Sequence, residues 1–127
     1  MIHEDIAGYY EFVVSEEDTA AAVGSGTLYV LATPRVAALM EMTAWKSLGN
    51  GLEEGCTTVG TWLSLEHLAP TPIGGTVTFE SRLVKIDGRE LTFSITARDA
   101  FGTIAQAEHK RVIVDSARFQ KKADGRR

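Results

Sequence analysis

Residues 31–50, LATPRVAALMEMTAWKSLGN, have the composition of a long buried helix. Strong helix formers (alanine, leucine and methionine) recur through the stretch, and apolar residues occur nearly all round the predicted helix. Thr33 is suited to the N-cap, with Pro34 at the first helical position. Gly49-Asn50-Gly51 supplies residues that commonly end helices. The sequence therefore predicts a rod of about 15 residues, roughly 22 Å long, that is buried on most sides.

Glu41 is the only carboxylate in this apolar stretch. The residues three and four positions away carry no cation that could pair with it along the helix, being Ala37, Ala38, Ala44 and Trp45. Such a carboxylate either faces water at the edge of the helix or meets a partner from another part of the fold. The sequence leaves both interpretations open: an ordinary solvent-facing side chain and a catalytic carboxylate.

Strand patterns lie on both sides of the helix. Residues 6–14 are rich in aromatic and β-branched types and predict a first strand, and residues 16–22 predict a short helix. After the long helix, further strands are expected at residues 57–68, 76–86, 90–98 and 103–114. One helix cannot cover both faces of such a sheet, so we expect an α+β hot-dog fold, with a curved antiparallel sheet wrapped round the helix. Its exposed edge strands favour pairing of two subunits.

His67 ends the strand predicted at residues 57–68. Strict alternation puts it on the more apolar face, with Val59, Thr61, Leu63 and Leu65. The same alternation assigns Gly60 to the opposite face. Because the apolar face should lie against the buried helix, His67 is expected on the side that also carries Glu41. A histidine there is either a hydrogen-bonded core residue or a catalytic one.

Composition and charge bound the class of protein. The chain has 127 residues with 44% hydrophobic side chains, enough for a core, and we expect a single domain over residues 1–127. A net charge of −4 argues against nucleic-acid binding, and no apolar run approaches the roughly 20 residues that cross a membrane. The first ten residues lack the pattern of a secretory signal, and the single cysteine, Cys56, favours a reducing cytoplasm. Three scattered histidines provide no metal-ligand set, and no cofactor is expected. Residues 118–127 form a basic tail that is expected to be partly disordered.

Several polar positions and one turn resemble those of the hot-dog thioesterases of the fluoroacetyl-CoA thioesterase type. The residues that carry this resemblance are Thr33, Glu41, Gly60 and His67. In that family a threonine begins the central helix, a glutamate lies eight residues later, and a histidine follows on the next strand. A Thr-Pro-x-Gly turn comes after the histidine, as residues 71–74 do here. The similarity covers roughly residues 30–119.

This resemblance implies a thioesterase that hydrolyses an acyl-CoA to the free acid and CoA. It also implies a homodimer with its sites near the subunit interface, while any further pairing of dimers is left open. Glu41 would act as a general base on water or attack the thioester directly. His67 would move or hold the proton, and Thr33 would orient the carboxylate or the water. The backbone N–H of Gly60 would point at the thioester carbonyl, where glycine permits close approach.

Simpler interpretations stand beside these roles. Thr33 is a complete N-cap without any chemistry, and Gly60 could only mark a bulge. His109 has charged neighbours and is expected on the strand surface. The candidates for contacts with CoA phosphates are Arg82, Arg89, Lys110 and Arg111, although charges on strand surfaces are usually only solvated.

Two other functions also remain open from the sequence. A hot-dog hydratase or dehydratase acting on an enoyl thioester would also use a carboxylate and a histidine. A non-catalytic acyl-CoA-binding module would keep the pocket without needing Glu41. Residues 24–27, Gly-Ser-Gly-Thr, lack the aromatic bulk that the fluoroacetate-resistance enzyme has before the helix. We therefore expect an acyl group other than fluoroacetyl.

Overall fold

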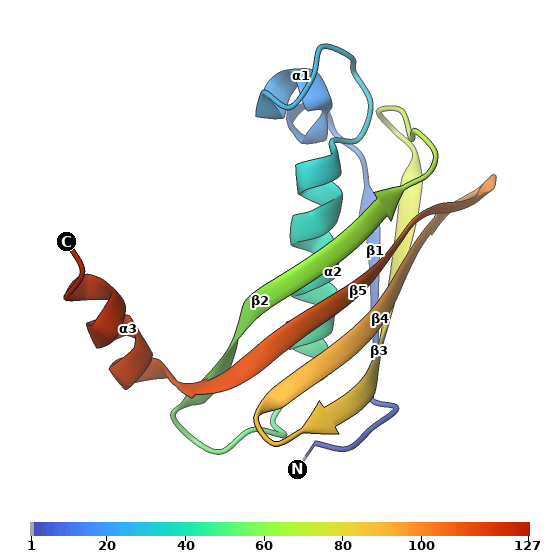
Figure 1. The fold of residues 1–127 in the computed structure, drawn as a ribbon. Helices are drawn as coiled ribbons and strands as arrows, with labels where there is room; N and C mark the ends of the chain where they lie inside the picture. Colours follow the sequence, from blue (N-terminus) through green and yellow to red (C-terminus); the bar gives the residue numbers. More distant parts are fainter. Residues whose placement is uncertain (1) are drawn as a thin grey trace.

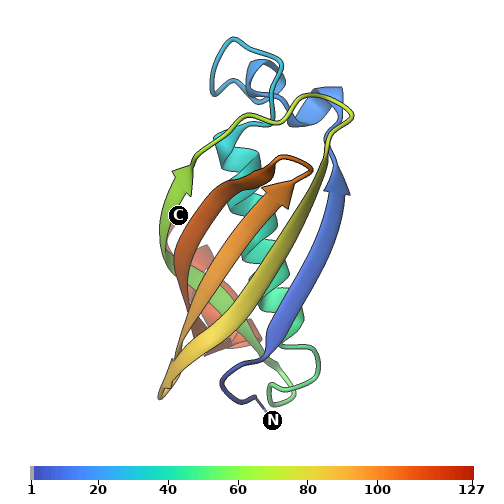
Figure 2. The ribbon, with the colours of Figure 1, turned by 90° about the vertical axis from the view of Figure 1, so that its right-hand side faces the viewer.

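The computed structural model describes residues 2–127. Its elements are β1 (Ala7–Val13), the 3-10 helix η1 (Glu16–Asp18), α1 (Ala20–Val23), α2 (Thr33–Ser47), β2 (Cys56–His67), β3 (Thr76–Asp87), β4 (Glu90–Asp99), β5 (Gly102–Asp115) and α3 (Ser116–Asp124). Within these residues, five strands form one antiparallel sheet in the order β1-β3-β4-β5-β2. The sheet curves round α2 (Figures 1 and 2). The predicted α+β hot-dog fold is confirmed.

Helix α2 packs its apolar side into the concave face of the sheet. Val36, Met40 and Ala44 are fully buried there, in the same core as Phe79 and Phe93. Full burial of a large apolar side chain contributes about 1.5–3 kcal/mol to stability, so this contact holds helix and sheet together.

The start of α2 differs from the prediction. Its N-cap is Ala32, and Thr33 is the first helical residue, so the N-cap role expected of Thr33 is wrong. The backbone N–H of Ala32 donates to the carbonyl of Asp18 at 2.9 Å, and the carbonyl of Ala32 accepts from the N–H of Val36 at 3.0 Å. A tertiary contact with η1 therefore sets the helix start, and the hydroxyl of Thr33 is not used as a cap.

A β-bulge divides strand β2. The pairing of β2 with β5 shifts register between Gly60 and Trp62, which leaves Thr61 as an extra residue. Before the bulge, Gly60 faces α2, and after it His67 does so. The strict alternation that assigned these two residues to opposite faces is therefore wrong, because one inserted residue reverses the phase of the strand.

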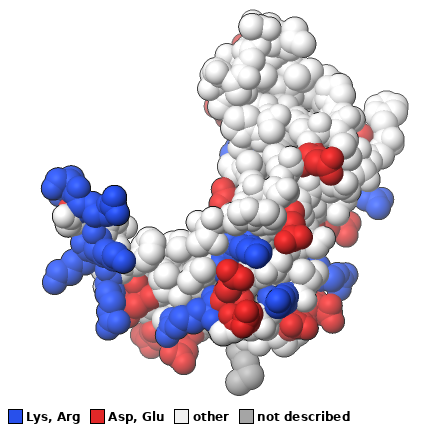
Figure 3. Space-filling model, in the orientation of Figure 1, with Lys and Arg blue, Asp and Glu red and all other residues white. Residues whose placement is uncertain are grey.

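The basic C-terminal residues, for which the sequence predicts partial disorder, form helix α3. The carboxylate of Asp115 caps it by accepting from the backbone N–H of Arg118 at 2.9 Å. The helix is exposed throughout and projects from the end of the sheet, where its Lys and Arg side chains gather (Figures 1 and 3). None of the helices in the described chain is long and apolar enough to cross a membrane.

Candidate active site

Thr33 and His67 form a hydrogen-bonded pair at the N-terminal end of α2. The hydroxyl Oγ1 of Thr33 lies 2.7 Å from Nδ1 of His67, the last residue of β2. The other ring nitrogen of His67, Nε2, is buried and has no hydrogen-bond partner among residues 2–127. Burial lowers the pKa of His67 below its usual value, more than the backbone of Ala69 raises it. The imidazole is therefore neutral near pH 7 and can exchange a proton with a bound reactant through Nε2.

A cavity of about 300 Å³ opens beside this pair. Apart from Thr33 and His67 themselves, its walls are made of small and apolar residues, among them Ala20, Ser25, Val30, Ala32, Leu68 and Ala69. No charged side chain of the described chain lines it. The cavity therefore suits an uncharged, apolar group carried next to a reactive carbon.

The segment of residues 18–32, which contributes Ala20, Ser25 and Val30 to the wall of this cavity, is tied to α2 by Asp18. The carboxylate of Asp18 accepts from the backbone N–H and the hydroxyl of Ser15 at 2.8 and 2.7 Å, and from Nε of Arg35 at 2.9 Å. Burial alone would raise the pKa of Asp18. The hydrogen bonds from Ser15 and Arg35 and the charge of Arg35 together lower it by more, so the net shift of this pKa is downward. An ionised Asp18 thus fixes one end of the segment, whereas residues 24–27 carry no bulky side chain.

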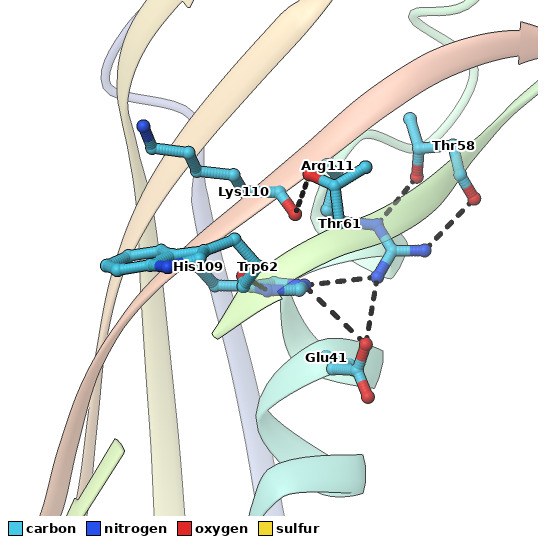
Figure 4. Close-up of polar contacts among 7 residues, drawn as sticks. All are labelled: Glu41, Thr58, Thr61, Trp62, His109, Lys110 and Arg111. Atoms are coloured by element: carbon cyan, nitrogen blue, oxygen red, sulfur yellow. Dashed lines mark hydrogen bonds and ion pairs between the residues drawn. The ribbon is translucent and has the colours of Figure 1, made fainter. Parts of the chain in front are cut away.

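Glu41 lies two turns further along α2, with its side chain 41% exposed. Its Oε2 is 3.6 Å from Nη1 of Arg111 and 3.9 Å from Nε2 of His109 (Figure 4). Both partners come from β5, so the helix itself supplies no cation, as the sequence indicated. Glu41 is therefore neither an isolated surface carboxylate nor a buried one. Its Oε2 faces the guanidinium of Arg111, while the side chain remains partly exposed to solvent.

Gly60 of β2 packs directly against this carboxylate. A Cβ atom at position 60 would lie 2.6 Å from Oε2 of Glu41 and 3.2 Å from Cε1 of His109. Any other residue would displace Glu41 from its present position. Glycine at position 60 therefore allows Glu41 to lie where it does, while the role expected of the Gly60 backbone N–H stays a prediction.

The surface position expected of His109 and the contact with CoA phosphates considered for Arg111 are both wrong. His109 is 1% exposed and Arg111 6% exposed, so neither is a strand-surface residue, and Arg111 is not free to reach a CoA phosphate. Their burial could have been predicted, because they continue an inward row along β5 that includes Ala105, Ala107 and Ile113. Lys110, between them, points the other way and lies near Glu90 at 4.0 Å.

The predicted site residues therefore fall into two groups, and the second group also contains residues that the sequence did not assign to the site. One is the Thr33–His67 pair, and the other, which we call the Glu41 cluster, consists of Glu41, Thr58, Gly60, His109 and Arg111. Thr33 and Glu41 are separated by eight residues of helix, which is about 12 Å along its axis. Among residues 2–127, no hydrogen bond or ion pair joins the two groups. A cavity of about 520 Å³ lies at the other end of α2 beside Asn50 and Cys56, and neither group lines it.

Comparison with known proteins identifies the family. The model of the fluoroacetyl-CoA-specific thioesterase family matches residues 14–117. The chain belongs to this family. Since the match covers most of the chain, the fluoroacetyl-CoA-specific thioesterase type predicted from Thr33, Glu41 and His67 is confirmed. The protein is an acyl-CoA thioesterase, a thioester hydrolase.

One relative and two solved structures show the similarity of this chain to known proteins. The fluoroacetyl-CoA thioesterase of Streptantibioticus cattleyicolor is 32% identical over 93 residues, which are 73% of this chain and 67% of that protein. A solved structure of a fluoroacetyl-CoA thioesterase has 26% identity and a TM-score of 0.94, covering 100% of this chain and 98% of that one. A hot-dog-like protein from Thermanaerovibrio acidaminovorans has 25% identity and a TM-score of 0.88, over 97% and 91% of the two chains.

Proposed function

We propose that this thioesterase works as a homodimer in which each active site combines the Thr33–His67 pair of one subunit with Glu41 of the other. The observation that carries this proposal is the separation of the two groups along α2. Each group has one reactive atom without a strong partner in its own subunit: Nε2 of His67 and the open side of the Glu41 carboxylate. A site for thioester hydrolysis needs both a base or nucleophile and a proton carrier.

The free edge of β2 supports a two-fold dimer. β2 is the last strand of the sheet, and within residues 2–127 only β5 pairs with it. Trp62 on this strand and Trp45 on α2 are each 47% exposed, which is a large apolar surface to leave in water. Antiparallel pairing of β2 with its copy would extend the sheet and bring two α2 helices together in opposite directions. The Glu41 position of one helix would then approach the start of the other.

The assembled site would contain the groups that thioester hydrolysis needs. Glu41 would activate a water molecule as general base, or attack the carbonyl carbon itself to give a transient anhydride. In either route the C–S bond breaks, and the neutral imidazole of His67 relays the proton that the CoA thiol receives. In the second route a water molecule then hydrolyses the anhydride, which releases the free acid and restores the Glu41 carboxylate. The hydroxyl of Thr33 holds the imidazole in place at 2.7 Å. The backbone N–H of Gly60 would stabilise the negative charge that develops on the carbonyl oxygen.

We further propose that the acyl group is uncharged, apolar and larger than acetyl. The cavity beside Thr33 and His67 measures about 300 Å³ and has no charged lining. Of residues 24–27, Gly-Ser-Gly-Thr, only Ser25 lines the cavity, and none of the four has a bulky side chain that would fill it. Structures of mutant fluoroacetyl-CoA thioesterases have been solved in complex with fluoroacetate and CoA and with acetyl-CoA.

Release of free CoA from a panel of acyl-CoA esters tests the reaction and its residues. Glu41→Gln and His67→Ala should each lower kcat by about 100-fold or more, with circular dichroism spectra like that of the wild type. Glu80→Gln and His3→Ala, at exposed positions, are matched controls that should keep full activity. Wild-type activity in Glu41→Gln would contradict the catalytic role of this carboxylate. Hydration of an enoyl-CoA without thiol release, or binding without turnover, would contradict the assignment of hydrolysis by this site.

A further inference from the structure

His109 is held in one protonation state by its two hydrogen bonds. Its Nδ1 lies 2.8 Å from the backbone carbonyl of Trp62, and a carbonyl only accepts, so Nδ1 carries a proton. Its Nε2 lies 3.1 Å from Nη1 of Arg111, and a guanidinium only donates, so Nε2 carries none. Burial is the main reason why the pKa of His109 lies below its usual value, and the charge of Arg111 adds to the effect, while the Trp62 carbonyl and Glu41 oppose it. The imidazole is therefore neutral.

This protonation state excludes His109 as a proton carrier for Glu41. Nε2 of His109 and Oε2 of Glu41 are both acceptors, and they lie 3.9 Å apart with no proton between them. Nη1 of Arg111 approaches both atoms, at 3.1 Å from Nε2 and 3.6 Å from Oε2. His109 thus contacts the carboxylate through the guanidinium of Arg111 (Figure 4).

The guanidinium of Arg111 is fixed at all three nitrogens. Its Nε donates to the hydroxyl of Thr58 at 2.8 Å, and its Nη2 donates to the backbone carbonyl of Thr58 at 3.0 Å. Thr58 thus holds one edge of the planar group, and His109 holds the third nitrogen, Nη1. A remaining N–H of Nη1 is left to face Glu41. Without the acceptor on His109, the plane could pivot about the two bonds to Thr58.

We propose that His109 is a positioning residue of the thioesterase, which acts through Arg111 to hold the Glu41 carboxylate in its catalytic orientation. The proposal rests on the proposed catalytic role of Glu41. The β2 bulge belongs to the same arrangement, because the Trp62 carbonyl that fixes the tautomer lies immediately after it. The other ring packed against His109 is Phe93 of β4, with centroids 6.4 Å apart, and it carries no charge.

Two substitutions separate the two hydrogen bonds of His109. His109→Gln keeps an acceptor near the place of Nε2, while His109→Asn keeps a donor near the place of Nδ1 and loses the acceptor. We expect His109→Asn to lower kcat about tenfold or more with KM within about twofold of wild type, and His109→Gln to restore most of kcat. His3→Gln, on the surface, is the control and should match the wild type. Equal kcat in both His109 variants, per folded molecule, would overturn the positioning role.

Nitrogen NMR of the histidine rings tests the same proposal without any substrate. In the full-length wild-type protein at neutral pH, His109 should give the signals of a neutral ring protonated at Nδ1, because its two hydrogen bonds fix that tautomer. A ring protonated at Nε2, or a charged ring at pH 7, would overturn the proposal. This spectrum does not depend on turnover, so it tests the protonation state of His109 even in a protein that releases no CoA. A failure to release CoA would instead contradict the proposed function.

Discussion

Gly60→Ala is a perturbation whose effect can be worked from the structure. The added Cβ would lie 2.6 Å from Oε2 of Glu41, which is about 0.8 Å less than the 3.4 Å at which ordinary contact begins. It would also lie 3.2 Å from Cε1 of His109 and 3.3 Å from Nη1 of Arg111, both tighter than usual. Of these three neighbours only Glu41 is partly exposed, at 41%, whereas the other two are buried. The carboxylate should therefore be the group that moves, by slightly under 1 Å.

A displacement of this size should lower the catalytic rate much more than it lowers the stability of the protein. Moving a flexible, half-exposed side chain should cost no more than about 1 kcal/mol of unfolding free energy. A displacement near 1 Å at a reacting group can lower the rate by about 100-fold. We expect Gly60→Ala to lose between about 10-fold and 100-fold in kcat for CoA release, with a chemical denaturation midpoint close to that of the wild type.

Gly8→Ala is the matched control for this experiment. A Cβ at position 8 would lie 2.7 Å from the backbone carbonyl oxygen of Thr43, which cannot swing away as a side chain does. This variant should lose stability by about 1–3 kcal/mol while its folded fraction keeps wild-type kcat. Wild-type kcat in Gly60→Ala would show that the Cβ does not displace Glu41 from a catalytic position. The same would follow if Gly60→Ala unfolded as readily as Gly8→Ala and its folded fraction kept full activity.

Two further predictions concern acid stability and acyl selection. Burial lowers the pKa of both His67 and His109 in the folded protein, while in the unfolded chain they return toward 6.5, so the unfolded state takes up protons first on acidification. Stability should be fully present above about pH 6.5 and fall below it, measured as a lower Tm at pH 5.5 than at pH 7.5; a Tm that is higher at pH 5.5 would contradict this sign. Ala20→Phe should fill the apolar cavity and shift the preferred substrate toward acetyl-CoA in a kcat/KM series from acetyl to decanoyl. An unchanged series would mean that the acyl group binds elsewhere.

The fold could be predicted because its signals are local. The apolar stretch at residues 31–50 forms α2, and the strand patterns after it form β2 to β5, with boundaries that differ by only a few residues. The sequence predicts Thr33, Glu41 and His67 in one site; of these three, Thr33 and His67 are in contact at 2.7 Å. The helix and strands depend on periodicity and turn residues, which a single sequence displays, whereas the site residues were indicated by the resemblance to a known family.

The rest depends on tertiary contacts that local patterns do not contain. The hydrogen bond of Ala32 to Asp18 moved the helix start, and the β2 bulge turned Gly60 toward Glu41. Charged neighbours concealed the burial of His109, although the alternation along β5 indicated it. The distance of about 12 Å between Thr33 and Glu41 does follow from the helix geometry, and it is the reason why we propose a site shared between two subunits.

Mixing two inactive variants tests the shared site most directly. Glu41→Gln and His67→Ala subunits, unfolded together and refolded in equal amounts, would form about one half mixed dimers, each with one intact and one doubly defective site. With a site shared between subunits, the mixture should regain about one quarter of wild-type CoA release, although each variant alone is nearly inactive. A mixture no more active than its components, in dimers verified to be mixed by mass spectrometry, would show that Glu41 and His67 act within one subunit and would contradict the account.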